Sequence, residues 1–364
     1  MDKLLIIDGS GLLVSNYYGT LPKEVQFAKT DAEKEMHYDK IAQKNGYYIN
    51  AIYPTIKQIL EYSIGSDAKY VAVCFDKSRS TTFRKEMYEE YKSNRKQTPE
   101  PLKAQFILCE ELLSKMGIPV FFHDRYEADD IAGSISKQFP ELEKILVSKD
   151  KDYLQLVDEE STVWMILHKK EIADNILESY AMTPEFGYTK YLPERAVPYD
   201  LDMVLSEKGV EAQYFSEVLA LAGDSADNIP GVKGISEESA EKLIGYYKTV
   251  KALYDDIDRH LKDKTIPELK EMWKTKLGFK RSPYSPLMDY RKEAFLSSEL
   301  AKIKTDIDLN ELLYNFNSSD LEIKGFAKNI QDKYTEVNAN LRKDLLDKIN
   351  TLMDEKVKSI EEER

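Results

Sequence analysis

The sequence predicts an α/β fold in which a mostly parallel central sheet is flanked by helices and followed by a helical region. Three short, mostly apolar runs at residues 4–7, 70–75 and 144–147 indicate strands. Such runs are typical of strands that are buried on both faces, as in parallel sheets. Residues 117–122 supply a fourth expected strand, and the stretches between the runs are long enough for helical crossovers.

We expect three regions along the chain. Residues 1–204 form the α/β core and include a helical segment near 77–105. Residues 205–310 form a helical region with glycine-rich turns, and residues 311–364 form a helical extension. The segment 22–50 is rich in Lys, Glu and Tyr, has no strand signals, and predicts a helical insertion.

The last part of the chain carries apolar side chains at helical spacing. This series is too short for the sustained heptads of a coiled coil, so we expect it to pack on the core. The alternative is a helix that docks a partner protein. The residues of the series are Leu346, Ile349, Met353, Val357 and Ile360.

The composition is that of a soluble globular protein. The chain has 364 residues, of which 42% are hydrophobic and 32% are charged, and no apolar run approaches the roughly 20 residues that span a bilayer. The N-terminus has only four consecutive apolar residues before Asp8, so it is no signal peptide. Cys74 and Cys109 lack metal-ligand spacing. We therefore expect a monomeric, cytoplasmic protein without membrane contacts.

The net charge of −13 excludes a protein that coats nucleic acid indiscriminately. The distribution of charge matters more than the sum, however. Between Lys77 and Lys96 there are seven basic residues and three acids. The sequence therefore allows a protein that grips nucleic acid locally and concentrates carboxylates elsewhere.

Acids follow three of the expected strands at or just beyond their ends, and others form short clusters. In open α/β sheets, ligands bind outside the carboxyl ends of the strands. Taken singly, these acids also fit helix caps and turns, but a series at one edge is less easily explained that way. The nine acids are Asp8, Asp76, Glu127, Asp129, Asp130, Asp150, Asp152, Asp224 and Asp227.

Convergence of these carboxylates would require cations. One pair of like charges about 4 Å apart costs about 4 kcal/mol at an effective dielectric of 20, which a marginally stable fold cannot bear several times over. Oxygen ligands without His or Cys indicate Mg²⁺ or Mn²⁺. We expect two such ions, which together activate water and stabilise the leaving oxygen of a phosphodiester.

The basic segment begins shortly after Asp76. Arg84, Lys92 and Arg95 are candidates to hold phosphates, and Arg84 or Lys92 to offset charge on a scissile phosphate. Tyr91 is a candidate to stack on a terminal base. The alternative is a solvated helix with Glu/Lys pairs, which the position next to a candidate metal ligand disfavours.

A glycine-rich turn precedes another apolar helix. Gly231 and Gly234 let the backbone approach a phosphate closely, Lys233 lies between them, and Ser236 is a plausible N-cap. A helix N-terminus presents free amides to phosphate. The combination predicts a helix-hairpin-helix that grips one DNA strand without reading its sequence.

Taken together, these motifs resemble the 5′-nuclease family, which includes bacterial and phage 5′→3′ exonucleases, flap endonucleases and the N-terminal domain of bacterial DNA polymerase I. The resemblance covers about residues 1 to 310 in the order of the family, and all nine acids fall on its carboxylate positions. The motifs that carry it are Asp8-Gly9-Ser10, Phe75-Asp76, Thr82-Phe83-Arg84, Tyr91 to Arg95, Glu127 to Asp130, Asp150-Lys151-Asp152, Gly223 to Gly234 and Ser297 to Asp306.

The resemblance implies a PIN-like core and a two-metal nuclease that hydrolyses DNA phosphodiesters at or near 5′ ends, flaps or nicks. It implies a helical arch near 77–105 that admits the 5′ end, with Arg84 and Lys92 at its base contacting the scissile phosphate. It also implies that the hairpin holds duplex DNA, in relatives sometimes through a bound K⁺. An RNA–DNA hybrid is a further possible substrate.

The sequence departs from the family pattern in three places. The family usually has Tyr-Arg where this chain has Val14-Ser15, the segment 22–50 is longer than usual, and the loop 180–210 is unusual. Two other functions remain open. One is a catalytically weak or inactive DNA-binding protein of the same fold, which nine intact carboxylates disfavour. The other is a phosphatase with Asp8 as nucleophile, which the absence of an Asp-x-Asp-Gly motif disfavours.

Overall fold

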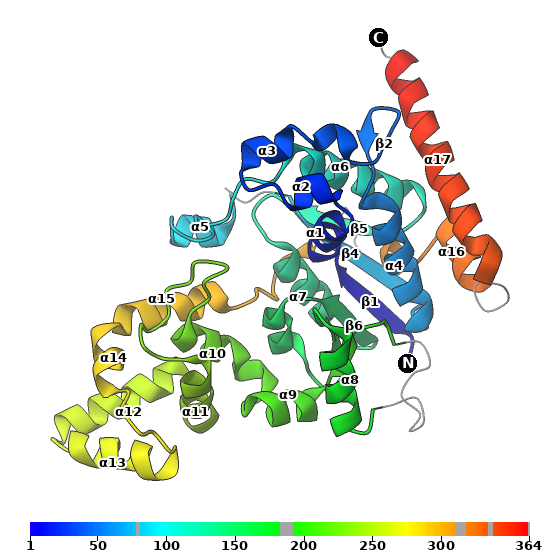
Figure 1. The fold of residues 1–364 in the computed structure, drawn as a ribbon. Coiled ribbons are helices and arrows are strands. Elements are labelled where there is room, and N and C mark those ends of the chain that lie inside the picture. Colours follow the sequence, from blue (N-terminus) through cyan, green and yellow to red (C-terminus); the bar gives the residue numbers. More distant parts are fainter. Residues whose placement is uncertain (78–80, 183–191, 310–317, 334–337, 363–364) are drawn as a thin grey trace.

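The computed structural model describes every residue except 78–80, 183–191, 310–317, 334–337 and 363–364 (Figure 1). An α/β core and a group of helices lie next to each other, and the last helix runs along the outer side of the core (Figure 1). No helix of the described residues is both long and apolar enough to cross a lipid bilayer.

A six-stranded sheet forms the centre of the core. Five strands run parallel, and the sixth, at one edge, runs antiparallel to its neighbour. The predicted mostly parallel sheet is therefore confirmed. In spatial order the strands are β5 (Val120–His123), β4 (Tyr70–Asp76), β1 (Lys3–Asp8), β6 (Glu143–Ser148), β7 (Ser161–Ile166) and β8 (Ala196–Tyr199).

Side chains alternate between two hydrophobic cores, one on each face of the sheet. In β1, Leu5 and Ile7 contribute to the core shared with α1, α4, α6, α16 and α17, whereas Leu4 and Ile6 contribute to the core shared with α7. Both faces are buried, which explains the mostly apolar runs. The second core continues without interruption into helices α10 to α12.

The helices before β8 connect the strands or cover the sheet. Their bounds are α1 (Gly9–Gly19), α2 (Lys23–Gln26), α3 (Asp31–Glu35), α4 (Ile52–Gly65), α5 (Phe83–Met87), α6 (Glu100–Lys115), α7 (Ala128–Gln138) and α8 (Lys170–Ser179), with a 3₁₀ helix, η2, at Lys151–Leu156.

The helices after β8 form the helical group and the C-terminal extension. Their bounds are α9 (Leu201–Lys208), α10 (Phe215–Ala222), α11 (Glu237–Tyr247), α12 (Val250–Lys262), α13 (Ile266–Lys276), α14 (Tyr284–Asp289), α15 (Arg291–Ala301), α16 (Gly325–Lys333) and α17 (Asn338–Glu362).

Two parts of the core differ from the sequence expectation. The segment 22–50 contains two short helices but also a small hairpin, β2 (Gln43–Lys44) and β3 (Tyr47–Tyr48). Its turn, Asn45-Gly46, has positive φ at both residues, the conformation that a two-residue hairpin requires. Strands β7 and β8 were not expected, and β8 carries Pro198, which an edge strand tolerates.

Helix α17 packs on the core through one face. Its side chains at Leu345, Ile349, Leu352 and Met353 are buried in the same core as α4 and α6. Lys356 at the edge of this face pairs with Glu111 of α6. The structure therefore supports the packing interpretation of the C-terminal apolar series.

This packing predicts that Leu352→Ala lowers the free energy of unfolding by about 2–5 kcal/mol, because it removes buried methyl groups and leaves a cavity. Urea-induced unfolding measures the change. Ile360→Ala in the same helix is the matched control, because Ile360 is exposed and such substitutions change stability by about 0.5 kcal/mol or less. Equal stability of the two variants would show that α17 does not contribute to the core.

Candidate active site

The sheet places its acids at one edge. Asp8 and Asp76 are the last residues of β1 and β4, which are neighbours in the sheet. Asp150 lies two residues beyond β6, the other neighbour of β1, and begins the 3₁₀ helix that contains Asp152. Glu127 is the N-cap of α7. Acids far apart in sequence thus meet because parallel strands end at the same edge.

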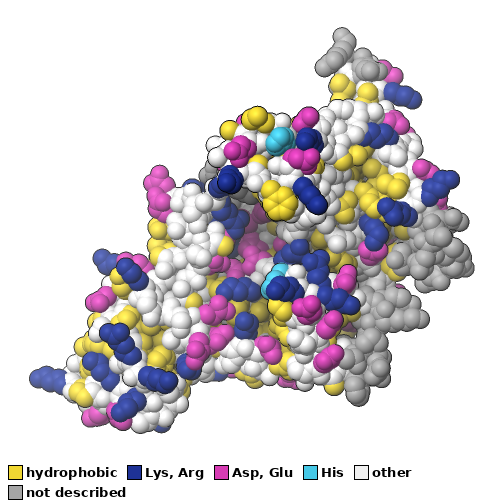
Figure 2. Space-filling model, viewed as in Figure 1, with side chains coloured by type: hydrophobic (Ala, Val, Ile, Leu, Met, Phe, Trp, Pro, Cys, Tyr) yellow, Lys and Arg dark blue, Asp and Glu magenta, His cyan; other side chains and the backbone are white. Residues whose placement is uncertain are grey.

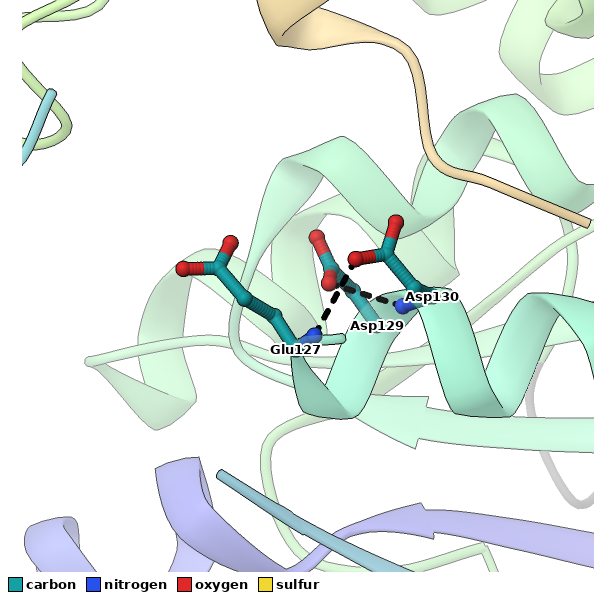
Figure 3. A group of neighbouring side chains, drawn as sticks. All are labelled: Glu127, Asp129 and Asp130. Carbon is teal, nitrogen blue, oxygen red and sulfur yellow. Dashed lines mark hydrogen bonds between the residues drawn. The ribbon is translucent and has the colours of Figure 1, made fainter. Parts of the chain in front are cut away.

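The N-terminus of α7 holds three carboxylates together (Figure 3). Oxygen atoms of Glu127, Asp129 and Asp130 lie within 4.8 Å of one another. Asp130 accepts a hydrogen bond from the Glu127 amide at 3.1 Å, and Asp129 accepts one from the Asp130 amide at 2.7 Å (Figure 3). Burial and the neighbouring charge of Asp130 raise the pKa of Asp129 well above its usual range.

Arg84 neutralises this cluster from inside the protein. Its guanidinium donates to both oxygens of Asp130 at 2.7 Å and to Glu127 at 3.1 Å. Its remaining bonds go to the carbonyl oxygens of Leu300 and Lys302. Burial opposes the positive charge, but the surrounding acids hold the pKa of Arg84 well above its usual value.

In this structure Arg84 bonds to the protein and does not line the cavity, and its expected role at a scissile phosphate stays a prediction. The side chain is only 2% exposed, and its donors are used by the protein. Asp130 is fully buried and accepts from Arg84, from the Glu127 amide and from the Lys304 amide. Arg84 and Asp130 form a buried ion pair. Asp130 also belongs, with Glu127 and Asp129, to a group of carboxylates close enough to hold a metal ion, so its predicted role as a ligand stays open.

Asp8 is positioned by two small neighbours. Its carboxylate accepts from the Gly11 amide at 2.7 Å and from the Ser148 hydroxyl at 2.9 Å. A Cβ at Gly11 would lie 2.4 Å from a carboxylate oxygen of Asp8, so this approach requires glycine. The Ser148 hydroxyl also accepts from the Asp150 amide at 3.0 Å. Burial raises the pKa of Asp8 to about 6.

Asp76 connects two elements of the site. Its amide donates to the Ser10 hydroxyl at 2.7 Å, and its carboxylate accepts from the Ala128 amide at 2.9 Å in the first turn of α7. Ser10 and Ser148 were not predicted as site residues. The sequence could have indicated them, because Ser10 lies in the motif Asp8-Gly9-Ser10 and Ser148 lies two residues before Asp150.

The loop 224–228 brings the last two acids from the helical group to the core. Asp224 and Ile229 exchange backbone hydrogen bonds at 3.0 and 2.8 Å and close the loop. The basic segment docks on it: the Lys92 amide donates to the Asp227 carbonyl at 2.9 Å, and the Asn94 side chain to the Ser225 carbonyl at 2.6 Å. The contacts join residues more than 130 positions apart.

Asn228 completes this docking from the other side. Its side chain donates to the Glu90 carbonyl at 2.6 Å and to the Ser93 hydroxyl at 3.2 Å. Asn228 and Lys92 both adopt positive φ, at 56° and 53°, a region that Asn tolerates better than Lys. The docking contacts thus hold Lys92 in an unfavourable backbone conformation. Asn94 and Asn228 were not predicted as site residues.

Lys92 and Arg95 neutralise the acids on this side. The Lys92 ammonium lies 2.7 Å from Glu127 and 3.3 Å from Asp227, and Arg95 pairs with Asp227. Burial alone would raise the pKa of the Asp227 carboxyl, but Lys92 and Arg95 hold it below its usual value. Unlike Arg84, both basic side chains reach the surface of a cavity.

This cavity has a volume of about 950 Å³. It corresponds to a hollow in the molecular surface where acidic side chains lie at the bottom and basic ones around them (Figure 2). None of the four histidines lines it. The predicted site residues that line it are Asp8, Asp76, Lys92, Arg95, Glu127, Asp129, Asp150 and Asp227.

Asp152 lies just behind the cavity wall. One of its carboxylate oxygens, Oδ1, is buried and accepts no hydrogen bond from the described residues. Burial and the charges of Asp150, Asp224 and Asp227 raise its pKa well above the usual range. An unsatisfied buried oxygen among like charges marks a place where a cation is favoured.

Two of the predicted DNA contacts are buried. Tyr91 is 3% exposed, and its hydroxyl donates to Glu127 and Asp227 at 2.8 and 3.2 Å, so it presents no face to a base. Gly231 is also buried. Its amide donates to the Ser297 hydroxyl at 2.9 Å, and a Cβ would lie 2.3 Å from the Gly223 nitrogen. In this structure both residues are packed within the site, and their contact with DNA stays a prediction.

The remaining hairpin residues are accessible. Lys233, Gly234 and Ser236 are exposed in the turn between α10 and α11. The Ser236 hydroxyl accepts from the Ser239 amide at 3.2 Å and caps α11, as expected. The hairpin therefore presents one lysine and a glycine with φ of 96° to solvent.

The fold and the site together define a class of protein: an α/β domain whose acidic cavity at the sheet edge is completed by a helical domain. Two family models match the chain. Residues 3–183 match the 5′-3′ exonuclease N-terminal resolvase-like domain, and residues 210–329 match the 5′-3′ exonuclease C-terminal SAM fold. The chain belongs to the 5′-3′ exonuclease family, a family of hydrolytic nucleases, and the resemblance noted in the sequence is confirmed.

Curated relatives support the same family. The chain is 31% identical to a 5′-3′ exonuclease of Buchnera aphidicola over 310 residues, which cover 84% of this chain and 88% of that protein. It is 32% identical over 320 residues to DNA polymerase I of Caldicellulosiruptor bescii, covering 87% of this chain and 31% of that protein. The chain thus spans about a third of the length of that polymerase.

A solved structure shares the fold. The phage T5 D15 protein, crystallised with metal ions, matches with a TM-score of 0.55 and 20% identity, covering 95% of this chain and 99% of that chain. The T5 5′-exonuclease has also been solved with divalent zinc ions bound, and it matches with a TM-score of 0.54 and 20% identity over 95% of this chain and 99% of that one. This agreement confirms the predicted fold class.

The buried pair predicts a large effect of Arg84→Met on stability. The change leaves the charge of Asp130 buried without its partner, which costs about 3–5 kcal/mol of unfolding free energy. Denaturant unfolding of the metal-free protein measures it.

Arg125→Met is the matched control, because Arg125 pairs with Glu86 on the surface and both side chains are more than half exposed. Surface pairs contribute about 1 kcal/mol or less. Similar small losses in both variants would contradict the structural role of Arg84.

Proposed function

We propose that this protein is a metal-dependent 5′ nuclease that hydrolyses DNA phosphodiesters at or near 5′ ends, as an exonuclease, a flap endonuclease or both. The observation that carries the proposal is one cavity lined by seven carboxylates, by Lys85, Lys92, Arg95 and Lys96 of the basic segment, and by no histidine. The family supports the same class of reaction.

The residues fit divalent cations. The donors are carboxylate oxygens, the ligands that Mg²⁺ and Mn²⁺ prefer, and Asp152 holds an unsatisfied buried oxygen. We assign one ion to Asp8, Asp76, Glu127 and Asp129, and a second to Asp150, Asp152, Asp224 and Asp227. The second group combines Asp152, whose buried Oδ1 accepts no hydrogen bond from the described residues, with Asp150, which accepts from the Asp152 amide at 3.0 Å, and with the acids of the loop 224–228.

Two bound ions would supply a hydroxide nucleophile and stabilise the leaving oxygen. The protein's own residues orient the substrate. Lys92 and Arg95 lie on the rim of the acids and can move from Glu127 and Asp227 to a phosphate that enters the cavity. Ser148 fixes Asp8 relative to Asp150, and Arg84 keeps the first turn of α7 in place from behind.

The exposed hairpin turn would hold duplex DNA. Lys233 and the free amides near the start of α11 suit a phosphate backbone and carry no sequence information. Carbonyl oxygens of the turn are also the kind of ligand that K⁺ takes. We propose that the protein acts as a monomer in a reducing cytoplasm, where Cys74 and Cys109 stay as the buried free thiols seen here.

A cleavage assay tests the proposal. A duplex with a 5′ flap, labelled at either end, is incubated with Mg²⁺, with Mn²⁺ or with chelator, and product lengths are measured. We expect metal-dependent cutting near the junction and a loss of at least about 100-fold for Asp8→Asn. Asp8 is the better choice than Asp130 because it lines the cavity. The matched control is Asp202→Asn, an exposed acid of α9, which should cut like the wild type.

The outcomes separate the functions. Binding of the flap without cutting in either metal would favour a protein that only holds DNA. Cutting that survives Asp8→Asn would overturn the assignment of the metal site. An RNA–DNA hybrid of the same shape, tested in parallel, shows which substrate is preferred.

The docking of Lys92 generates a separate prediction. Asn228→Gly keeps the positive φ without strain but removes the hydrogen bonds to Glu90 and Ser93. We expect kcat to fall about 10- to 100-fold with little change in KM, because Lys92 is displaced from its catalytic position.

Asn45→Gly is the matched control, since Asn45 also has positive φ and makes one side-chain bond, to Asp354, far from the cavity. Asn94→Ala should resemble Asn228→Gly in kinetics. A change in KM alone would show that the docking contacts serve binding and not the position of Lys92.

A further inference from the structure

One wall of the cavity is apolar, in contrast to its acidic floor. Helix α6 turns Lys103, Phe106, Ile107 and Glu110 toward the cavity, at spacings i, i+3, i+4 and i+7 that form one face of a helix. The opposite face of α6 packs in the hydrophobic core. On the cavity side only Phe106 also packs against this core, so Ile107 is not required to attach the helix.

The apolar part of this wall is open to solvent. Ile107 is 62% exposed, although branched aliphatic side chains are among those most often buried. Phe106 is partly buried and meets Phe75 edge-on, with ring centroids 6.2 Å apart. Val14 of α1 lines the same cavity. Together Val14, Phe106 and Ile107 form an apolar wall next to the carboxylates.

We propose that this apolar wall binds a nucleobase of the strand that is cut. The proposal rests on the function proposed above and adds a subsite to it. A phosphate at the carboxylates brings with it the base of the adjoining nucleotide, and every base has an apolar face. Contacts between base faces and apolar or aromatic side chains are tolerant of sequence.

The surroundings of the wall favour a nucleotide over other apolar ligands. Exposed lysines at Lys77, Lys96 and Lys103 line the same cavity, which suits the phosphates on either side of a base. A cavity of about 950 Å³ is of the size that holds a small ligand, and it is continuous with the acids. The wall itself offers no hydrogen-bonding group, so we expect no preference among the four bases.

A double-mutant-type cycle tests the subsite by combining a substitution in the protein, Ile107→Ala, with the removal of one base from the DNA. Binding of a 5′-flap duplex is measured by fluorescence anisotropy in chelator, with normal nucleotides or with one abasic nucleotide placed in turn at each position next to the junction. Ile107→Ala should weaken binding of the normal flap by about 5-fold or more. One abasic position should weaken wild-type binding similarly, and the two changes together should cost no more than either alone.

Two further variants keep the test specific. Ile107→Leu keeps the apolar contact and should bind nearly as the wild type does. Ile172→Ala removes a partly exposed isoleucine of α8 that does not line the cavity. For this variant, each abasic nucleotide should reduce the affinity for the flap by the same factor as it does for the wild type. Because Ile107 is exposed, its variants should unfold at the wild-type temperature.

The results overturn the proposal in distinguishable ways. If Ile107→Ala weakens normal and abasic flaps equally at every position, or weakens neither, the wall does not bind a base. Cleavage of the normal flap by the wild type in Mg²⁺ would then leave the proposed nuclease function intact. If the wild type neither binds nor cuts the flap, both the subsite and the nuclease function are overturned.

Discussion

The constraint on which this structure depends is the gathering of carboxylates at one edge of a sheet and on a loop beside it. Like charges in a partly buried site repel strongly, so the fold must provide positive charge close by. It does so with three side chains of the same segment, Arg84, Lys92 and Arg95, which contact Glu127, Asp130 and Asp227. The basic segment is therefore a structural part of the acidic site.

The same constraint explains why the core and the helical group form one unit. Asp224 and Asp227 belong to the helical group and the other acids to the core, so the site is complete only when the two are joined. The hydrogen bonds of residues 90–95 with the loop 224–228, one between backbones and the others from side-chain amides, make this connection. The tight approach of Gly231 to Gly223 shapes the loop from behind, and a continuous hydrophobic core supports it.

The sequence predicted the sheet and the acids but not the depth of each side chain. Mostly apolar runs identify strands buried on both faces, which is why β1, β4 and β6 were found. Strand β7 was missed because its apolar run, Thr162 to Ile166, lies after a turn-rich stretch. Strand β8 was missed because it contains Pro198, a residue that strands avoid. The Asn45-Gly46 pair is a sequence signal for a hairpin turn. It was overlooked because the segment 22–50 was assigned as helical from its composition.

For the site, the motifs identified residues that the fold brings together, but they did not show which side chains are accessible. Arg84, Tyr91 and Gly231 lie within motifs of the family, and spacing alone cannot show that all three are buried. Burial depends on what other segments pack over them: the backbone at Leu300 and Lys302 for Arg84, Glu127 and Asp227 for Tyr91, and Ser297 for Gly231. These partners are distant in sequence, so only the tertiary structure reveals them.

Accessibility divides the basic residues into two kinds. Arg84 makes two bonds to Asp130, one to Glu127 and two to backbone carbonyls, so a phosphate would have to compete with five bonds in a buried site to recruit it. Lys92 and Arg95 share Asp227 at the cavity surface, and cations bound to the acids would displace them toward the substrate by direct repulsion. On this hypothesis Arg84 stays bound to the acids, whereas Lys92 and Arg95 leave them when metal ions and a phosphate enter the cavity. One segment thus carries a buried arginine that is bound to the protein and two basic residues, Lys92 and Arg95, that line the cavity.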